Sequence, residues 1–120
     1  MSLDVYLSRK KWISYDEGKT HEIDYEQVYE ANITHNLGKM AHEAGIYKAL
    51  WRPEEIKAVY AKDIIGKLKI GLGKLKKFPK YYERFNAVNG WGLYKHFVPF
   101  VEKYLNACME NPEAEIEISR

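Results

Sequence analysis

Cysteine is almost absent from this sequence, which contains one in 120 residues. A single thiol cannot form a disulfide within the chain, so the fold must be held by packing and hydrogen bonds. Cys108 falls on the apolar face of a predicted helix, where a cysteine is more often a small buried hydrophobe than a nucleophile. We therefore favour a packing role for it.

Long apolar runs are also missing. No window approaches the roughly 20 apolar residues that a membrane-spanning helix needs, and residues 1–5 lack the basic stretch and apolar run of a secretion signal. We therefore expect a cytoplasmic protein with no membrane partner. The net charge is only +2, from 19 basic and 17 acidic residues, so binding to nucleic acid is not favoured.

Apolar and aromatic side chains, by contrast, are plentiful. Hydrophobic residues make up 46% of the chain and aromatic residues 14%. A chain of this length buries about two thirds of its unfolded surface, so we expect a single domain over residues 1–120 with an aromatic-rich core. The charges are unevenly distributed, because residues 57–80 contain eight lysines and one acid, Asp63. The sequence therefore predicts a basic side and an acidic side.

Apolar and polar residues alternate with a period of two near the start of the chain, which is typical of strands with one buried face. This pattern predicts a strand over residues 2–8 and a second over residues 12–15, with turn chemistry at residues 16–19. The alternation then resumes, with Ile23 and Tyr25 set against acidic neighbours. We expect an antiparallel hairpin whose open face is acidic.

Residues 33–44 have apolar side chains at helical spacing, which predicts a helix of about three turns that Gly45 ends. His35 and His42 fall opposite the apolar stripe, so we expect both to face away from the core. At 1.5 Å per residue they stand about 10 Å apart along the axis, too far to bind one metal ion. Asn36, at the edge of the buried face, either contacts a ligand or ties down a neighbouring loop; we favour the loop.

Residues 45–53 predict an apolar connection that packs against the core. Two interpretations of Trp51 and Arg52 are open. The ring can stack on a ligand while the guanidinium binds a phosphate or carboxylate. Alternatively, the tryptophan belongs to the core and the arginine pairs with Glu54 or Glu55 on the surface, which is the interpretation we favour.

Residues 54–77 predict a helix with a break near residues 60–63. Its outward stripe combines Gly66, Ile70 and Gly73 between flanking lysines. Glycine inside a helix costs about 1 kcal/mol relative to alanine. This smooth face therefore either admits the backbone of a partner or is tolerated on a solvated surface.

Residues 86–92 form a predicted loop with a tight turn at Asn89. Trp91 lies between two glycines in this loop, where it is either a plug over the core or a stacking platform, and we favour the plug. The clearest helix follows the loop and carries a narrow apolar stripe. Pro99 inside it predicts a kink or a late start near Val98.

The order of patterns is strands, several helices and a closing strand that contains Ile116 and Ile118. It predicts an α+β fold, in which about four helices cover one face of a small antiparallel sheet. That sheet would combine the N-terminal strands with the C-terminal strand, which pairs most simply with the first strand.

Several short motifs carry a resemblance to a known family. MSLDVYL at the start, ANITHNL, AGIY, LWRP, and NGWG followed by a helix and a short strand resemble a family of small proteins of phages and bacterial mobile elements. The resemblance covers nearly the whole chain, and the combination of ANITHNL, LWRP and NGWG is specific. It implies no particular activity. By analogy with other small phage proteins, it suggests a regulator or a counter-defence factor.

Three classes of function compete, none with a cofactor or a metal. The first is a counter-defence protein that sequesters a nucleotide-like or other phosphorylated ligand. The side chains that could supply stacking, amide contacts and anion binding are Asn32, His35, Asn36, Trp51, Arg52, Arg84, Asn89 and Trp91. The second is an interaction module, an inhibitor of a host protein or a homo-oligomer, that uses the lysine-flanked helix face 62–77 around Gly66, Ile70 and Gly73. The third, an enzyme, lacks a nucleophile with a base at recognisable spacing. We favour the first.

Overall fold

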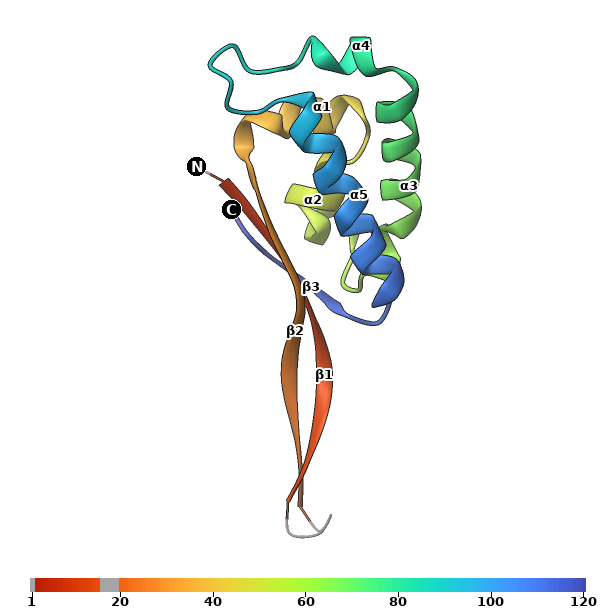
Figure 1. Ribbon diagram of the computed structural model, residues 1–120. Coiled ribbons are helices and arrows are strands. Elements are labelled where there is room, and N and C mark those ends of the chain that lie inside the picture. The colour runs from red at the N-terminus through yellow and green to blue at the C-terminus, as the bar shows by residue number, and fades with distance from the viewer. Residues whose placement is uncertain (1, 16–19) are drawn as a thin grey trace.

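The computed structural model describes residues 2–15 and 20–120. Strands lie towards both ends of this chain and helices between them (Figure 1). The strands are β1 (Ser2–Tyr15), β2 (Thr20–Thr34) and β3 (Glu115–Ser119). The α-helices are α1 (Gly38–Glu43), α2 (Tyr47–Trp51), α3 (Lys62–Lys77), α4 (Pro79–Glu83) and α5 (Tyr94–Glu110), and the short 3-10 helices are η2 (His35–Leu37) and η3 (Pro53–Ile56). The predicted α+β class is confirmed.

β1 is the central strand of an antiparallel sheet whose order, over the described residues, is β2-β1-β3. Leu3, Val5 and Leu7 are fully buried because the pleat turns alternate side chains of β1 towards the helices. Each of these side chains stabilises the fold by about 1.5–3 kcal/mol. β3 pairs with β1 as far as Ser8, which confirms that the closing strand joins the first strand.

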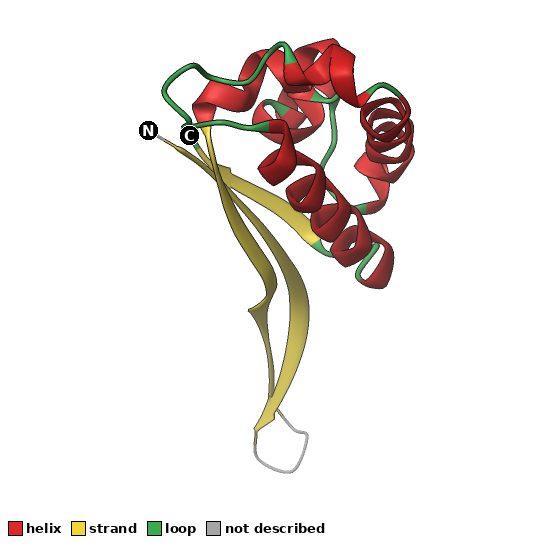
Figure 2. Cartoon of the chain, turned by 45° about the horizontal axis from the view of Figure 1, so that its top comes forward, coloured by secondary structure: helices red, strands yellow, loops and turns green. Residues whose placement is uncertain are grey.

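Past β3, the hairpin continues as a two-stranded arm, formed by residues 9–15 of β1 and residues 20–26 of β2. The arm projects beyond the helices, which gather beside the other end of the sheet (Figures 1 and 2). The molecule is accordingly long, with extents of 59, 27 and 23 Å. Neither face of the arm is covered by the helical layer.

The prediction of separate strands over residues 2–8 and 12–15 is wrong, because β1 runs without a break and pairs with β2 along its length. The basic residues at positions 9–11 interrupt the alternation of apolar and polar side chains without interrupting the strand. Because the helices do not cover the arm, no buried face requires apolar side chains at alternate positions there. The pairing shifts by one residue between Leu7 and Ser8, where the arm begins. The turn predicted at residues 16–19 lies outside the described residues.

The helices form one layer on the inner face of the sheet (Figure 2). α5 contributes the side chains of Phe97, Val101, Tyr104 and Cys108, all fully buried, and packs along α3. The ring of Tyr104 stacks on that of Tyr29 from β2, with centroids 5.9 Å apart. The predicted apolar stripe of this helix is therefore confirmed as the contact with the sheet.

The helix predicted over residues 33–44 begins later than expected. β2 extends to Thr34, and Ile33 pairs with Leu3 in the sheet, so the helical conformation starts only at η2 and α1. Gly45 has a φ of 79°, the left-handed conformation in which glycine ends helices, as predicted. In the last helix, the predicted late start is also wrong, because α5 begins at Tyr94 and contains the proline.

The connection predicted over residues 45–53 packs against the core as expected, but it contains the helix α2. The backbone of α3 packs very closely against the start of this connection. A Cβ atom added to Gly71 would stand 2.3 Å from Ile46 Cγ2 and 3.2 Å from the carbonyl oxygen of Ala44, so only glycine permits this approach. The break predicted near residues 60–63 lies earlier in the structure, over residues 57–61, because α3 already begins at Lys62. In the described part of the chain, no helix has the length and apolarity that crossing a membrane requires.

Candidate functional site

Four of the residues selected from the sequence meet at the end of the sheet near the termini. Asn32 lies near the end of β2, Asn36 in η2, and Asn89 and Trp91 in the loop between α4 and α5. Together with Ser2 and Thr34 they line one hollow. We call this group of six residues the Trp91 surface.

Hydrogen bonds on both sides fix the backbone of Trp91. Its N–H donates to Asn89 Oδ1 at 2.9 Å, and its carbonyl oxygen accepts from Asn36 Nδ2 at 2.7 Å. Asn36 is held in turn, because its own backbone N–H donates to Thr34 Oγ1 at 3.3 Å. The interpretation that Asn36 ties down a neighbouring loop is therefore confirmed.

The glycines beside Trp91 allow the loop to lie directly on η2. Gly90 has a φ of 78° and Gly92 a φ of 122°, conformations in which other residues are strained. A Cβ atom added to Gly92 would stand 2.9 Å from Asn36 Cβ. The backbone of Gly92 also closes the loop, since its carbonyl oxygen accepts from the N–H of Ala87 at 2.9 Å. The loop is thus tied both to itself and to the body of the protein.

The ring of Trp91 is 71% exposed, so the plug interpretation is wrong. The loop contacts the body through the backbone of Gly92 and the side chain of Asn36, which leaves the ring outside. Leaving a large apolar side chain in water forgoes about 1.5–3 kcal/mol. An uncovered ring on a fixed backbone is well suited to stacking, because little conformational entropy is lost when a partner covers it.

Trp91 lines two hollows. One of about 330 Å³ is lined by the Trp91 surface, and one of about 440 Å³ is lined by Asn32, Ile33, Thr34, Leu37, Gly90, Trp91, Gly92 and His96. Volumes of about 300–1,000 Å³ are typical of small-molecule sites. Asn32 is oriented by its Nδ2, which donates to Ser2 Oγ at 2.9 Å and to Asp4 Oδ1 at 2.7 Å. Among the described residues, neither lining includes a lysine or an arginine.

Trp51 belongs to the core, as the favoured interpretation predicted. It is 3% exposed and stacks on Tyr47 with ring centroids 5.3 Å apart. Its indole Nε1 donates to His35 Nδ1 at 2.8 Å. The prediction that His35 faces away from the core is therefore wrong: η2 replaces the expected helical turn and aims the imidazole at Trp51. Nδ1 of this imidazole is therefore the acceptor for the indole N–H.

The two predicted arginines lie apart from the Trp91 surface. Arg52 pairs with Glu55, with Nε and Oε2 3.9 Å apart, as expected for a surface arginine. The guanidinium of Arg84 lies over the ring of Tyr81, 4.6 Å from its centroid. The structure therefore brings together the predicted amides and one tryptophan, but not the predicted anion-binding groups.

The stripe on α3 is exposed as predicted. Ile70 is 64% exposed, and a Cβ atom added to Gly66 or Gly73 would meet no atom within 4 Å. The neighbouring lysines face solvent on the same helix. This face is smooth and basic, with one apolar side chain at its centre.

Features of common enzyme chemistry are sparse in the described part of the chain. Cys108 is buried, and burial raises the pKa of its thiol to about 12, so the nucleophilic thiolate is not formed at neutral pH. No cluster of three or more His, Cys, Asp or Glu side chains with metal-binding geometry occurs among the described residues.

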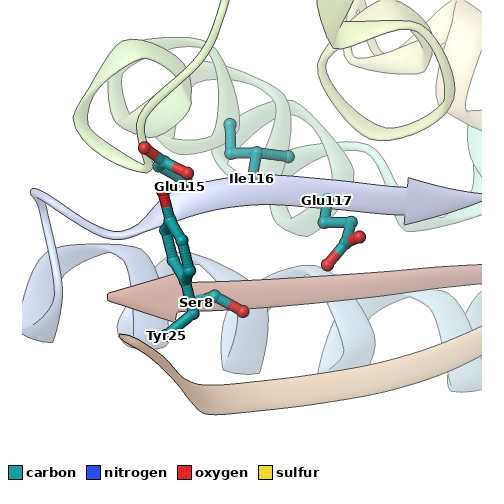
Figure 3. A pocket seen from close by; sticks show the side chains of 5 residues that line it. All are labelled: Ser8, Tyr25, Glu115, Ile116 and Glu117. Atoms are coloured by element: carbon teal, nitrogen blue, oxygen red, sulfur yellow. The ribbon is translucent and has the colours of Figure 1, made fainter. Parts of the chain in front are cut away.

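Sequence reasoning missed the exposed apolar side chains of the arm. Trp12, Ile23 and Tyr25 are 68%, 45% and 53% exposed, although the alternation placed the last two on a buried face. At the base of the arm, Tyr25 points towards Glu115 across β1, and both line a hollow of about 420 Å³ (Figure 3). The signal that could have revealed this exposure is Trp12 itself. It directly follows three basic residues in the strand pattern, where a buried side chain is not expected.

Comparison with known proteins identifies no relative. No family model, no curated protein and no solved structure matches the chain.

Proposed function

We propose that this protein binds a planar, hydrogen-bonding small ligand, of the kind that a nucleobase represents, by stacking it on Trp91. The observation that supports this proposal is the exposed ring on a backbone held by Asn89 and Asn36. A ligand that covers the ring gains the free energy of burying that apolar surface. The loop that carries the ring is already ordered, so binding costs little conformational entropy.

The side chains around the ring indicate which part of a ligand is recognised. Asn32 Nδ2 already donates to Ser2 and Asp4, which leaves its Oδ1 as an acceptor, and Asn89 Oδ1 already accepts from Trp91, which leaves its Nδ2 as a donor. An acceptor and a donor of this kind match the edge of a nucleobase. No lysine or arginine lines either hollow in the described part of the chain. Recognition in this proposal therefore centres on the base, and the phosphate of a nucleotide-like ligand points into solvent.

A role in counter-defence forms part of the proposal. If the chain is a phage protein, as its motifs suggest, binding would sequester a signalling nucleotide of the host. This role rests on analogy with other small phage proteins.

Thermal unfolding in the presence of nucleobases, nucleosides, nucleotides and cyclic nucleotides tests the binding proposal. A ligand at 100 times its dissociation constant stabilises the folded state by about 2.7 kcal/mol, which raises the melting temperature by several degrees. Trp91→Ala should abolish that rise. Trp12→Ala is the matched control, because Trp12 is 68% exposed against 71% for Trp91 but lies on the arm.

Two results would count against binding at this surface. One is a panel in which no compound raises the melting temperature of the unmodified protein. The other is a rise that Trp91→Ala leaves intact, which would move the site elsewhere.

A second candidate function, an interaction module, is supported by the exposed Ile70 between Gly66 and Gly73 on α3. Under this alternative, Ile70→Glu should release a host partner or shift the size-exclusion profile. Val88→Glu, at a fully exposed position in the loop between α4 and α5, is the control and should change neither. An unchanged profile and unchanged partner capture with Ile70→Glu would eliminate this candidate.

A further inference from the structure

The outer face of the sheet, which points away from the helices, has different chemistry at its two ends. Towards the termini it is acidic, and we call Asp4, Glu30 and Glu117 the acidic base. These three carboxylates surround Tyr6, where desolvation and the nearby negative charges raise the pKa of the phenol. The base is therefore a concentrated patch of negative charge.

The arm continues this outer face with apolar and basic side chains. Trp12 lies opposite Ile23 and Lys10 lies opposite Tyr25, so the four share one face, and we call them the arm patch. Alternate residues of a strand share a face, which places Lys10 and Trp12 on the same side as Tyr6. Three large apolar side chains are thus exposed on an element that has no core of its own.

The other face of the arm, over residues 9–11 and 24–26, carries opposite charges. Arg9 Nη2 and Glu26 Oε2 form an ion pair at 3.0 Å, and Lys11 lies opposite Asp24. This part of the arm is therefore amphipathic, with its apolar face turned away from the core of its own chain. Because an isolated two-stranded hairpin is at best marginally stable in water, an apolar face of this kind calls for a cover.

We propose that the cover is a second copy of this chain, with two outer sheet faces packed antiparallel about a twofold axis. Each arm patch then lies over the acidic base of the other copy. Lys10 of one copy faces carboxylates of the other, while Trp12 gains the ring of Tyr6 as an apolar neighbour. The same surface supplies both halves of the contact, as a twofold interface requires.

The dimensions fit a pairing that includes the base as well as the arm. β1 has 14 residues, which at about 3.3 Å each gives a face about 46 Å long and, for two strands, about 10 Å wide. That is roughly 460 Å² per copy, or about 900 Å² over both, for two flat faces without protruding side chains. This area lies just below the roughly 1,000 Å² that specific interfaces exceed, as expected for a weak dimer. The arms alone would offer about half of this area.

Charge argues against the other ways of covering the arm. The free edge of β2 carries Asp24, Glu26 and Glu30, so two such edges paired side by side would bring carboxylates together. A nucleic acid laid along the outer face would set its phosphates against the acidic base. Face-to-face pairing of two copies instead brings opposite charges together.

Sedimentation equilibrium over a range of chain concentrations tests the proposal independently of ligand binding. The unmodified protein should form dimers that weaken as salt is raised, since screening reduces the attraction between the lysine and the carboxylates. Trp12→Glu or Ile23→Glu should yield monomers. Ile70→Glu is the matched control, because it adds the same charge at an equally exposed apolar position on α3, and should leave the dimer intact.

A charge exchange gives a second readout. Lys10→Glu should weaken the dimer, and adding Glu117→Lys to it should restore association. A protein that stays monomeric up to millimolar concentration would overturn the proposal. So would a dimer that survives Trp12→Glu and dissociates with Ile70→Glu, because that interface would lie on α3.

Discussion

Replacing Gly92 by alanine tests whether the loop that carries Trp91 is held as tightly as its geometry indicates. A φ of 122° is strained for any residue with a Cβ atom, which costs about 1–3 kcal/mol. The new Cβ would also stand 2.9 Å from Asn36 Cβ and 3.4 Å from Thr34 Cγ2, and overpacking of this kind costs about 1–3 kcal/mol more. We therefore expect Gly92→Ala to lower the free energy of unfolding by about 2–6 kcal/mol.

Gly90→Ala is the matched comparison within the same loop. Its φ of 78° imposes conformational strain, but an added Cβ would meet no atom within 4 Å. We expect a cost of about 1–2 kcal/mol from the left-handed backbone alone. Urea denaturation at neutral pH measures both variants, and the difference between them reports the contacts with Asn36 and Thr34 together with the less favourable φ of Gly92.

Equal costs for the two variants would refute this reasoning. They would mean that the loop does not rest on Asn36, so that the ring of Trp91 is not held in a fixed position. A larger cost for Gly92→Ala, accompanied by loss of ligand binding, would link the rigidity of the loop to recognition.

Two further predictions concern the side-chain hydrogen bonds of His35 and Asp63. His35→Ala should lower the free energy of unfolding in urea by about 1–3 kcal/mol, because it leaves the indole N–H of Trp51 without its acceptor. A smaller loss with Trp51→Phe, which removes that donor, would confirm that the unpaired donor is the cause. Hydrogen bonds from the backbone N–H groups of Tyr60 and Val59 lower the pKa of Asp63. The ionised carboxylate therefore stabilises the fold fully above the ordinary aspartate pKa, and this stabilisation is lost as the pH falls through the lowered pKa of the folded state. Asp63→Asn should therefore reduce the loss of stability on acidification, and an unchanged acid-denaturation curve would contradict this.

Much of the fold could be predicted from periodicity. Leu3, Val5 and Leu7 alternate because one face of β1 is covered, and the narrow stripe of α5 exists because that helix packs on the sheet. The arm escaped prediction because no core covers it, so β1 carries basic residues there in place of buried apolar ones. Residues 9–11 therefore seemed to end a strand that in fact continues.

The candidate site was harder to predict than the fold. Asn36 and Asn89 were selected as amides, but only the folded chain shows that both hold the backbone of Trp91. Trp51 and Trp91 have similar local contexts, each near a turn and polar neighbours. Their opposite environments depend on contacts distant in sequence: α2 is buried in the core, whereas Gly92 holds the neighbouring ring outside it.

The most direct test of the central claim follows the indole N–H signals of the three tryptophans by NMR in ¹⁵N-labelled protein. On addition of a stabilising nucleobase or nucleotide, the signal of Trp91 should shift in a saturable manner. The other two signals should not shift: that of Trp51, whose indole N–H is hydrogen-bonded to His35, and that of Trp12 on the arm. A Trp91 signal that does not move while the protein is saturated with ligand would contradict the account.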